Sequence, residues 1–323
     1  MKNFLSVQDA GDIDSLIRTA LEYKDDPFKD EGLGRGKRIG LLFFNPSLRT
    51  RMSTQLAAKN LGLDCIVLNA GSEGWSLEFA EGAVMNGTTV EHIKDAAPIL
   101  GAYFDILAIR TFPKLQSRTE DESDQIIHSF IRYAKVPVVS LESANLHPLQ
   151  SLADLITITE NRAEGSIRGR KPRVVLTWAP HIKPIPQCVG NSFAQWLHAW
   201  GKADFVYTAP KGYELSETFV KGIPYTDQQG AALEGADFVY VKNWSSVSQY
   251  GKVLGEHPGW MLTERSLALA PNAKVMHCLP VRRNVELSDE VLDGPRSLLT
   301  RMAINRTWSA QAVLSRILTG RVS

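Results

Sequence analysis

The sequence has few cysteines, no long apolar run and almost no net charge. Its 323 residues include three cysteines, too few and too scattered for a disulfide framework or a zinc site, which favours a reducing compartment. No apolar stretch is long enough to span a membrane, and no basic-then-apolar segment at the N-terminus precedes a cleavage site. The formal net charge of +1 gives the whole molecule no general affinity for nucleic acid. We therefore expect a cytoplasmic protein that binds neither membrane nor nucleic acid, and any phosphate site must be local.

Two common phosphate-binding motifs are also missing. No Gly-x-Gly-x-x-Gly opens a helix, and the glycine-rich segment 32–36 precedes an apolar run instead of following one, so a nicotinamide-binding site is not indicated. The sequence has no Walker-type loop, no internal repeat and no low-complexity segment either.

Short apolar runs alternate with helical patterns along the chain. This alternation predicts an α/β protein with doubly wound, parallel sheets. The runs are Ile39–Phe44, Cys65–Leu68, Ile106–Ile109, Val136–Val139, Val174–Thr177, Asp204–Tyr207, Phe238–Val241 and Val275–His277. A polar, Gly- and Arg-rich stretch at 160–173 separates the fourth run from the fifth. We expect two parallel-sheet domains, one formed by 1–147 plus 303–323 and the other by 148–302.

Two helices are expected to join these domains. Residues 148–160 would form the first. The second covers Thr307–Leu318, where Trp308, Val313 and Ile317 have helical spacing, and we expect it to pack on the first domain.

The segment from Ser47 to Leu61 follows an apolar run and has the pattern of a helix. Met52, Leu56 and Leu61 recur on one face, which we expect to be buried. Pro46 suits the entry to this helix, and Ser47 suits its N-cap.

Arg49 and Arg51 lie in the first turn of this expected helix. The free backbone N–H groups and the dipole at a helix N-terminus favour an anion, and two arginines are unfavourable there unless an anion compensates them. The pattern therefore indicates a phosphate site, with a solvated helix start as the alternative.

Further polar residues follow other expected strands, at the edge where ligands bind in open α/β sheets. Arg110 ends one run and could add to the phosphate cluster. In "LHPLQ", His147 and Gln150 could hold the carbonyl oxygen and the amide of a carbamoyl group, although a loop histidine bonded to backbone is the alternative. In "MHCLP", no base is evident near Cys278, so we expect Cys278 and Leu279 to supply backbone carbonyls and not a nucleophile.

Three motifs, in their order and at their separations, resemble the aspartate/ornithine carbamoyltransferase family over essentially the whole chain. They are Ser-x-Arg-Thr-Arg, His-Pro-x-Gln and His-Cys-Leu-Pro. The resemblance implies two α/β domains, a catalytic trimer with active sites at subunit interfaces, and no metal or organic cofactor. It implies that the first domain binds carbamoyl phosphate through Ser47, Leu48, Arg49, Thr50, Arg110, His147 and Gln150. Cys278, Leu279 and Arg306 would close over the substrate from the other side.

The implied reaction is the attack of an amine on the carbamoyl carbon. Four side chains would stabilise the charge that develops on the carbonyl oxygen and on the departing phosphate: Arg49, Thr50, Arg110 and His147. The amine must be neutral to attack, so activity should rise with pH, and no protein nucleophile is required.

Lys242 indicates which amine is used. Typical ornithine enzymes resemble one another in having an aspartate and then Ser-Met-Gly here, whereas this chain reads "VYVKNWSSVSQYG". A lysine would repel the α-ammonium of ornithine but could pair with the α-carboxylate of an N-acylated ornithine, so the chain looks like the acylornithine branch. Three further features agree with this branch: Trp75 in a loop that reaches a neighbouring subunit, Glu142 placed to meet the δ-amine, and the proline-rich segment 178–187.

The loop 86–92 resembles the segment that discriminates between acyl groups. Acetyl-specific members have a glutamate at the place of Val90 and succinyl-specific members have a proline. An apolar side chain cannot repel a succinyl carboxylate, although Glu91 next to it could if it turned inward.

Three cations could attract a succinyl carboxylate: His181, Lys183 and Arg282. Glu286 also departs from acetyl-type members, which have a lysine after "RRNV". We therefore expect N-succinylornithine as the carbamoyl acceptor in arginine biosynthesis. The alternatives are N-acetylornithine, free ornithine or a diamine as acceptor, or a catalytically silent paralogue that binds carbamoyl phosphate.

Overall fold

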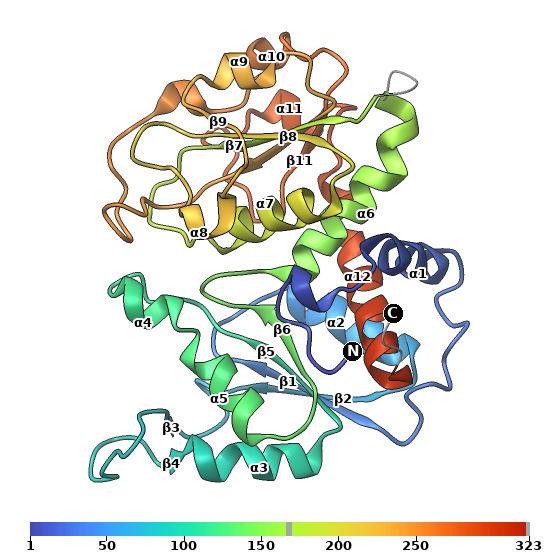
Figure 1. The fold of residues 1–323 in the computed structure, drawn as a ribbon, viewed down its shortest axis with the longest axis vertical. Helices are drawn as coiled ribbons and strands as arrows, with labels where there is room; N and C mark the ends of the chain where they lie inside the picture. The colour runs from blue at the N-terminus through green and yellow to red at the C-terminus, as the bar shows by residue number, and fades with distance from the viewer. Residues whose placement is uncertain (166–169, 321–323) are drawn as a thin grey trace. The chain divides into compact units, whose positions relative to one another are not determined.

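The computed structural model describes residues 1–165 and 170–320, and Figure 1 shows that their strands lie mainly in two sheets. By its internal contacts the chain divides into unit 1, which comprises Met1–Lys114, Thr119–Leu149 and Arg306–Ser323, and unit 2, which comprises Leu115–Arg118 and Gln150–Asn305. The boundaries predicted from the sequence, after 147 and after 302, remain predictions about functional domains.

The sheet of unit 1 has four strands in the order β2-β1-β5-β6. These are β1 (Arg38–Phe43), β2 (Asp64–Asn69), β5 (Ile106–Arg110) and β6 (Val138–Glu142), all in parallel pairs. The side chains of β1, β5 and β6 are almost all buried, as continuous apolar runs require. The predicted parallel α/β sheet is confirmed in this unit.

Helices cover both faces of this sheet (Figure 1). Ile93 and Ala97 of α3 (Ile93–Tyr103) and Ile127 and Phe130 of α5 (Gln125–Tyr133) pack with apolar residues of the strands in one core cluster. The other helical segments of unit 1 are η1 (Val7–Asp9), α1 (Ile13–Asp25), α2 (Arg49–Asn60) and α4 (Arg118–Glu122, whose first residue is in unit 2). A small parallel pair, β3 (Leu77–Glu78) and β4 (Glu91–His92), lies outside the main sheet.

The sheet of unit 2 has five strands in the order β11-β10-β7-β8-β9. They are β7 (Arg173–Trp178), β8 (Asp204–Thr208), β9 (Tyr225–Thr226), β10 (Phe238–Lys242) and β11 (Lys274–Met276), again all parallel. The four predicted apolar runs of this unit are confirmed as strands. The two-residue strands β3, β4 and β9 were not predicted, because so short a segment has no periodicity.

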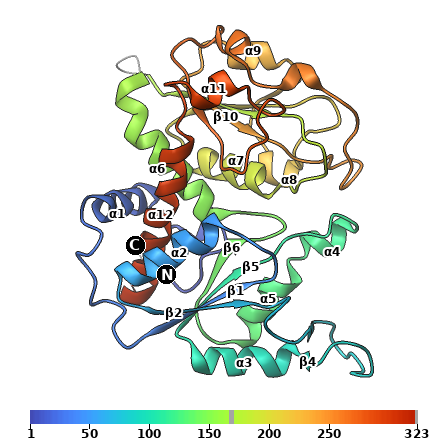
Figure 2. The same cartoon turned by 180° about the vertical axis from the view of Figure 1, so that it is seen from behind.

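Helices also lie on both faces of the second sheet. Figure 2 shows α9 and α11 on one face and α7 and α8 on the other. Their bounds are α7 (Cys188–Trp200), α8 (Glu217–Val220), α9 (Gln229–Leu233), η2 (Pro258–Trp260), α10 (Glu264–Leu267) and α11 (Asp289–Asp293). Within 1–165 and 170–320, no helix is both long enough and apolar enough to cross a membrane.

Two longer helices contain the points where the chain changes unit. They are α6 (Pro148–Gly165) and α12 (Leu299–Thr319), both longer than expected. The expected contact of the last helix with the first domain is made by hydrogen bonds from Gln311 to Pro27 O (2.7 Å) and from Arg316 to Ala10 O (3.1 Å).

The helix α2 differs from its prediction in two respects. Its N-cap is Leu48 and not Ser47, and no side chain caps it within the described chain. Met52 and Leu56 are 52% and 47% exposed, so only Leu61 of the expected face is buried. The buried face consists of small and polar residues, namely Thr50, Ser53, Thr54, Ala57, Ala58 and Asn60.

The partner of this buried face explains why it is polar. The amide of Asn60 donates to Gln311 Oε1 at 3.0 Å, and Arg306 donates to the Thr50 hydroxyl. The face therefore packs on a polar side of α12, where apolar side chains would leave buried donors unsatisfied. The prediction failed because nine residues separate Met52 from Leu61, which at 3.6 residues per turn puts them on opposite sides of the helix. The side with Met52 and Leu56 is exposed, and Leu61 is buried.

Candidate active site

Functional side chains in unit 1 gather at the carboxyl ends of three parallel strands. The loop after β1 leads through Pro46 into α2, Arg110 ends β5, and Glu142 ends β6. Parallel strands bring their carboxyl ends to one edge of a sheet, which is why residues so far apart in the chain meet.

Arg110 and Glu142 form a buried ion pair at this edge. Arg110 Nε and Nη2 lie 2.8 Å and 2.7 Å from Glu142 Oε2, and Nη1 donates to the carbonyl oxygens of Asn45 (3.1 Å) and Pro46 (2.9 Å). Burial raises the pKa of Glu142, but His147 and the guanidinium groups of Arg110 and Arg306 outweigh it and hold the pKa below its ordinary value. The guanidinium therefore fixes the loop after β1 to the end of β6.

A second cluster joins Thr50, His147 and Arg306. Arg306 Nη2 donates to the Thr50 hydroxyl and lies 3.3 Å from His147 Nε2. A guanidinium has only donors, so His147 Nε2 accepts this hydrogen bond. All three side chains are buried, at 8% exposure or less. The cluster places a hydroxyl, an imidazole and a guanidinium at the first turn of α2.

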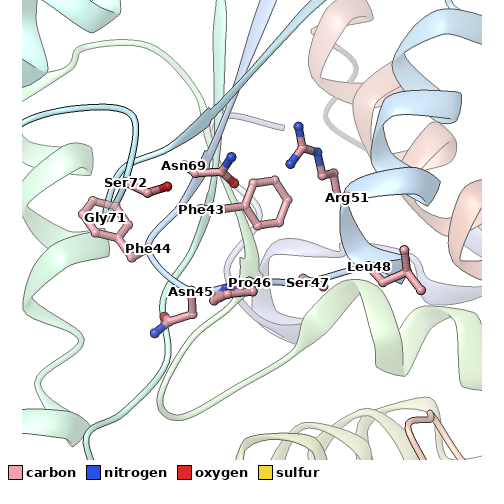
Figure 3. A pocket seen from close by; sticks show the side chains of 10 residues that line it. All are labelled: Phe43, Phe44, Asn45, Pro46, Ser47, Leu48, Arg51, Asn69, Gly71 and Ser72. Atoms are coloured by element: carbon pink, nitrogen blue, oxygen red, sulfur yellow. The ribbon is translucent and has the colours of Figure 1, made fainter.

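A cavity of about 700 Å³ lies beside this strand–helix junction (Figure 3). Its lining includes Ser47, Leu48 and Arg51, and Figure 3 shows Arg51 projecting from α2. Arg49 is half-buried, and its Nε has no hydrogen-bond partner among the described residues. A donor left in this state suits an anion that is bound from outside the chain.

The Trp75 and Val90 side chains lie on one exposed loop of unit 1. The indole Nε1 of Trp75 donates to Glu91 Oε2 at 2.7 Å, and the Val90 backbone N donates to Ser76 O at 2.9 Å. Trp75 is 60% exposed and Val90 is 63% exposed. The loop thus holds both predicted residues together and ties Glu91 to Trp75.

Lys242 is at the carboxyl end of β10 in unit 2, where the sequence predicted it. Its side chain is only 8% exposed, and Nζ donates to Asn243 Oδ1 at 2.7 Å. Burial of an ammonium costs free energy unless an anion or several acceptors compensate it. Lys242 is therefore suited to bind a carboxylate.

His181, Arg282 and Glu286 form a polar network in unit 2. Arg282 Nε donates to His181 Nε2 at 3.1 Å, so His181 Nδ1 carries the proton and donates to Lys183 O at 2.8 Å. Burial lowers the pKa of His181 below its ordinary value, which agrees with a neutral ring. A cavity of about 610 Å³ is lined by His181 and by Asn284 and Val285 of the same segment as Arg282.

Gln150 and Cys278 both lie in unit 2. Gln150 belongs to unit 2, donates to Asp154 Oδ1 at 2.8 Å, and has an Oε1 atom that no described residue satisfies. Cys278 is buried beside Tyr240, and burial together with the charges of Asp154 and Cys278 raises the pKa of Tyr240. The roles predicted for Gln150, Cys278 and Leu279 stay predictions.

The sequence did not assign roles to two features of these clusters. The carbonyl oxygens of Asn45 and Pro46 accept from Arg110, but no sequence pattern indicates this, because every residue has a backbone carbonyl. Glu286 was noticed only as a departure from acetyl-type relatives, yet it is completely buried. Among the described residues, no group of three or more His, Cys, Asp or Glu side chains could hold a metal ion.

Comparison with known proteins identifies the class of enzyme. Residues 2–160 match the family description "Aspartate/ornithine carbamoyltransferase, carbamoyl-P binding domain", and residues 187–317 match the "Asp/Orn binding domain" of the same family. The chain belongs to the aspartate/ornithine carbamoyltransferase family and is a carbamoyltransferase.

Similar proteins cover the whole chain. An N-succinylornithine carbamoyltransferase of Bacteroides thetaiotaomicron is 45% identical over 322 residues, which is 99% of each chain. An N-acetylornithine carbamoyltransferase of Xanthomonas campestris is 34% identical and covers 98% of this chain and 97% of its own.

Solved structures are similar over the same extent. An acetylornithine transcarbamylase complexed with acetylcitrulline has a TM-score of 0.89 at 34% identity and covers 98% of this chain and 99% of its own. A variant of N-acetyl-L-ornithine transcarbamylase in which a glutamate is replaced by valine, complexed with carbamyl phosphate and N-succinyl-L-norvaline, has a TM-score of 0.90, with 98% and 100% coverage.

Proposed function

We propose that this enzyme transfers the carbamoyl group of carbamoyl phosphate to the δ-amine of N-succinyl-L-ornithine, giving N-succinyl-L-citrulline and phosphate in arginine biosynthesis. The N-succinylornithine carbamoyltransferase relative is 45% identical, against 34% for the N-acetylornithine relative. The observation that carries the choice of an acylated acceptor is the buried Lys242 at the end of β10.

The phosphate of carbamoyl phosphate would bind at the first turn of α2. Hydrogen-bond donors for it lie at the positive end of the helix dipole. They come from the backbone around Ser47 and Leu48, the half-buried Arg49 and the Thr50 hydroxyl. Arg110 holds the loop that leads into this turn. Donors preorganised in this way stabilise the departing phosphate, and loss of one typically lowers the rate by about 10²–10³-fold.

The acceptor amine attacks the carbamoyl carbon. A C–N bond forms, the bond from the carbamoyl carbon to the phosphate oxygen breaks, and the proton that the amine loses passes to the departing phosphate. His147, whose Nε2 accepts a hydrogen bond from Arg306, is proposed to act on the carbonyl oxygen, Gln150 on the amide and Glu142 on the δ-amine. Cys278 and Leu279 would supply carbonyl oxygens to the same group. Since the amine must be neutral, the rate is expected to rise with pH.

Lys242 distinguishes acylated ornithine from free ornithine. The α-nitrogen of free ornithine is an ammonium, and two like charges at about 4 Å repel each other by roughly 4 kcal/mol near a protein surface. An N-acylated α-nitrogen is uncharged, so this repulsion disappears and Lys242 can pair with the α-carboxylate.

Arg282 and His181 support a succinyl group as the acyl group. Arg282 is exposed, and its guanidinium is fixed against the neutral His181 ring, so it keeps donors for a second carboxylate. N-acetylornithine is the second candidate, because Glu286 Oε1 lies 4.0 Å from His181 Nε2 and a succinyl carboxylate would meet this negative charge.

One assay separates the acceptors. The enzyme is supplied with carbamoyl phosphate and, in parallel, with ornithine, N-acetylornithine or N-succinylornithine, and phosphate release is measured. We expect the highest kcat/KM with N-succinylornithine. Turnover of free ornithine alone would contradict the role of Lys242, and no turnover with any acceptor would indicate a silent paralogue.

We also propose a cytoplasmic homotrimer in which Trp75 reaches the active site of a neighbouring subunit. The exposed indole supports this proposal, because a large apolar side chain is costly to leave in water. No disulfide joins Cys65, Cys188 and Cys278, which suits a reducing compartment.

A further inference from the structure

We propose that Glu286 is a positioning residue that, without touching the substrate, fixes Arg282 against His181 and thereby sets the preference for an acyl group that carries a carboxylate. The inference rests on the proposed function, since it concerns how the acyl group of that acceptor is selected. It uses only contacts within unit 2.

Both carboxylate oxygens of Glu286 are engaged, and each contacts a different segment. Oε2 lies 2.8 Å from His277 Nε2, and Oε1 accepts from the backbone N of Arg282 at 3.0 Å. The side chain is completely buried. Glu286 therefore joins the end of β11 to the turn that carries Arg282.

The tautomer of His277 follows from its other neighbour. The backbone N of Leu279 donates to His277 Nδ1 at 2.9 Å, so Nδ1 has no proton and Nε2 donates to Glu286. A neutral imidazole and an ionised carboxylate thus satisfy every donor and acceptor in this chain of hydrogen bonds. Burial raises the pKa of Glu286, but His277 and the charge of Lys242 outweigh it and keep the pKa below its ordinary value.

The same turn holds the Arg282 side chain. Backbone hydrogen bonds from Val285 N (3.2 Å) and Glu286 N (3.0 Å) to Arg282 O close the turn, and the Glu286 carboxylate binds the Arg282 N–H at its start. With its backbone held at both ends, Arg282 directs Nε to His181 at 3.1 Å. Loss of the carboxylate contact would free the turn and the guanidinium together.

The carboxylate has two opposite effects on a succinyl group, and positioning is the larger. Its charge repels the second carboxylate of the substrate, but that charge is already compensated by Lys242 and by the His277 N–H. A guanidinium fixed in one arrangement loses less conformational entropy on binding than a mobile one. We therefore infer that Glu286 favours succinyl over acetyl.

Two variants separate position from charge. Glu286→Asp keeps the negative charge but is one methylene too short to reach both donors, whereas Glu286→Gln keeps the length but leaves one acceptor oxygen for two donors. The matched control is Glu290→Gln, because Glu290 is exposed on α11 and none of its side-chain contacts is with this network. Circular dichroism and thermal unfolding establish that each variant is folded.

The first measurement is the KM and kcat of each variant with N-succinylornithine and with N-acetylornithine. We expect both Glu286 variants to raise the KM for N-succinylornithine by about tenfold, the effect of losing one ordered polar contact, with a smaller change for N-acetylornithine. The KM for carbamoyl phosphate should not change, whereas general structural damage would change it. A folded Glu286→Asp enzyme with the succinyl-to-acetyl preference of the parent would overturn the inference.

The second measurement does not require turnover. Imidazole NMR signals of the ligand-free enzyme give the pKa of His181, with a His181→Gln sample to assign the signal. Three charges face this ring: Glu286 raises its pKa, and Lys242 and Arg282 lower it. Glu286→Gln should therefore lower the pKa of His181 further, and Glu290→Gln should leave it unchanged.

The two measurements distinguish failure of this inference from failure of the proposed function. An unchanged His181 pKa in folded Glu286→Gln enzyme would overturn the geometry whatever the acceptor is. A parent enzyme that turns over no acylated ornithine would overturn the proposed function, while the NMR result would still test the network. If the parent turns over N-succinylornithine and both Glu286 variants match it, only the inference is wrong.

Discussion

Arg110 and Glu142 form the charge pair on which the candidate phosphate site of unit 1 depends. Burial of two charges costs several kcal/mol each, and their attraction and hydrogen bonds must offset this cost. The pair is therefore weak evidence for net stability. Its value lies in geometry, because the Arg110 donors also hold the carbonyl oxygens of Asn45 and Pro46, which lead into α2.

The first prediction concerns Glu142→Gln and its pH dependence. At pH 7 the variant leaves the buried Arg110 without a counter-charge, and we expect it to lower the free energy of unfolding by on the order of 3–5 kcal/mol. The pKa of Glu142 is lower in the folded state than in the unfolded chain. Its ionised form therefore stabilises the fold at any pH above the ordinary carboxyl pKa of about 4.3. This stabilisation is lost as the pH falls through the pKa of the folded state.

Urea unfolding of parent and variant from pH 7 to pH 3 measures this effect. The difference in unfolding free energy should be largest at pH 7. It should shrink as the pH falls below the ordinary carboxyl value of about 4.3, because the unfolded chain then takes up a proton that folded Glu142 still resists. Glu31→Gln is the control, since Glu31 is exposed and its side chain makes no hydrogen bond or ion pair with the described residues. A difference of the same size at pH 3 and pH 7 would show that the charge of Glu142 does not contribute.

Among the secondary-structure elements, the loop that carries Trp75 and Val90 has its own internal support. The hydrogen bond from Trp75 Nε1 to Glu91 Oε2 holds Glu91 on the indole, so Val90 next to it remains the side chain free to face an acyl group. The loop is closed by the β3–β4 pair, in which Leu77 aligns with Glu91. Trp75 and Val90 should therefore act together.

The second prediction is that Val90→Glu weakens the use of N-succinylornithine relative to N-acetylornithine. A carboxylate at this place would repel the second carboxylate of the succinyl group, and we expect the ratio of the two kcat/KM values to fall by about tenfold. Val84→Glu is the control, because Val84 is exposed on the same loop and this substitution adds the same charge. An unchanged ratio in Val90→Glu would mean that this loop does not line the acyl site.

On the scale of the whole molecule, an apolar surface on unit 1 supports the proposed trimer. Leu48 at the N-cap of α2 and Met52 and Leu56 within it follow one another at four-residue spacing and are all exposed. Ile66 of β2, an edge strand, is exposed as well. Residues at this spacing share one helix face. A face of this kind is costly in water, so burial against a second copy of the chain is favoured.

The third prediction tests whether neighbouring subunits share sites. Trp75→Ala and Arg49→Ala should each have low activity as separate preparations. After subunits exchange between the two preparations, a site that takes Arg49 from one chain and Trp75 from the other is intact, so phosphate release should recover in part. Arg49→Ala mixed with Thr50→Ala is the control, because both residues belong to one first turn and no intact site can form.

Absence of recovery after demonstrated subunit exchange would contradict a shared site. Exchange itself can be followed by mixing differently labelled chains and measuring energy transfer between them. Recovery in the Arg49→Ala and Thr50→Ala mixture would show that the assay does not report on shared sites.

The sequence by itself determined the two parallel sheets and the place of the candidate phosphate site. Continuous apolar runs indicate parallel strands, and the eight predicted runs became strands of the two sheets. The strand–helix junction at 43–51 is equally local, since Pro46, the hydroxyls and the two arginines are neighbours in the chain. The place of Lys242 at the end of β10 also follows from the sequence, because it depends only on position along one strand.

Only the tertiary structure decided which side chains meet. Arg110 pairs with a residue 32 positions away and Arg306 with one 256 positions away, and no local pattern contains that information. The buried face of α2 is polar because α12 offers it polar partners. Glu286 is one acidic residue among 35 in the sequence, and only its burial against His277 and the Arg282 turn distinguishes it. The physical reason is that backbone preference and apolar spacing act over a few residues, whereas hydrogen bonds and ion pairs depend on distances that the completed fold sets.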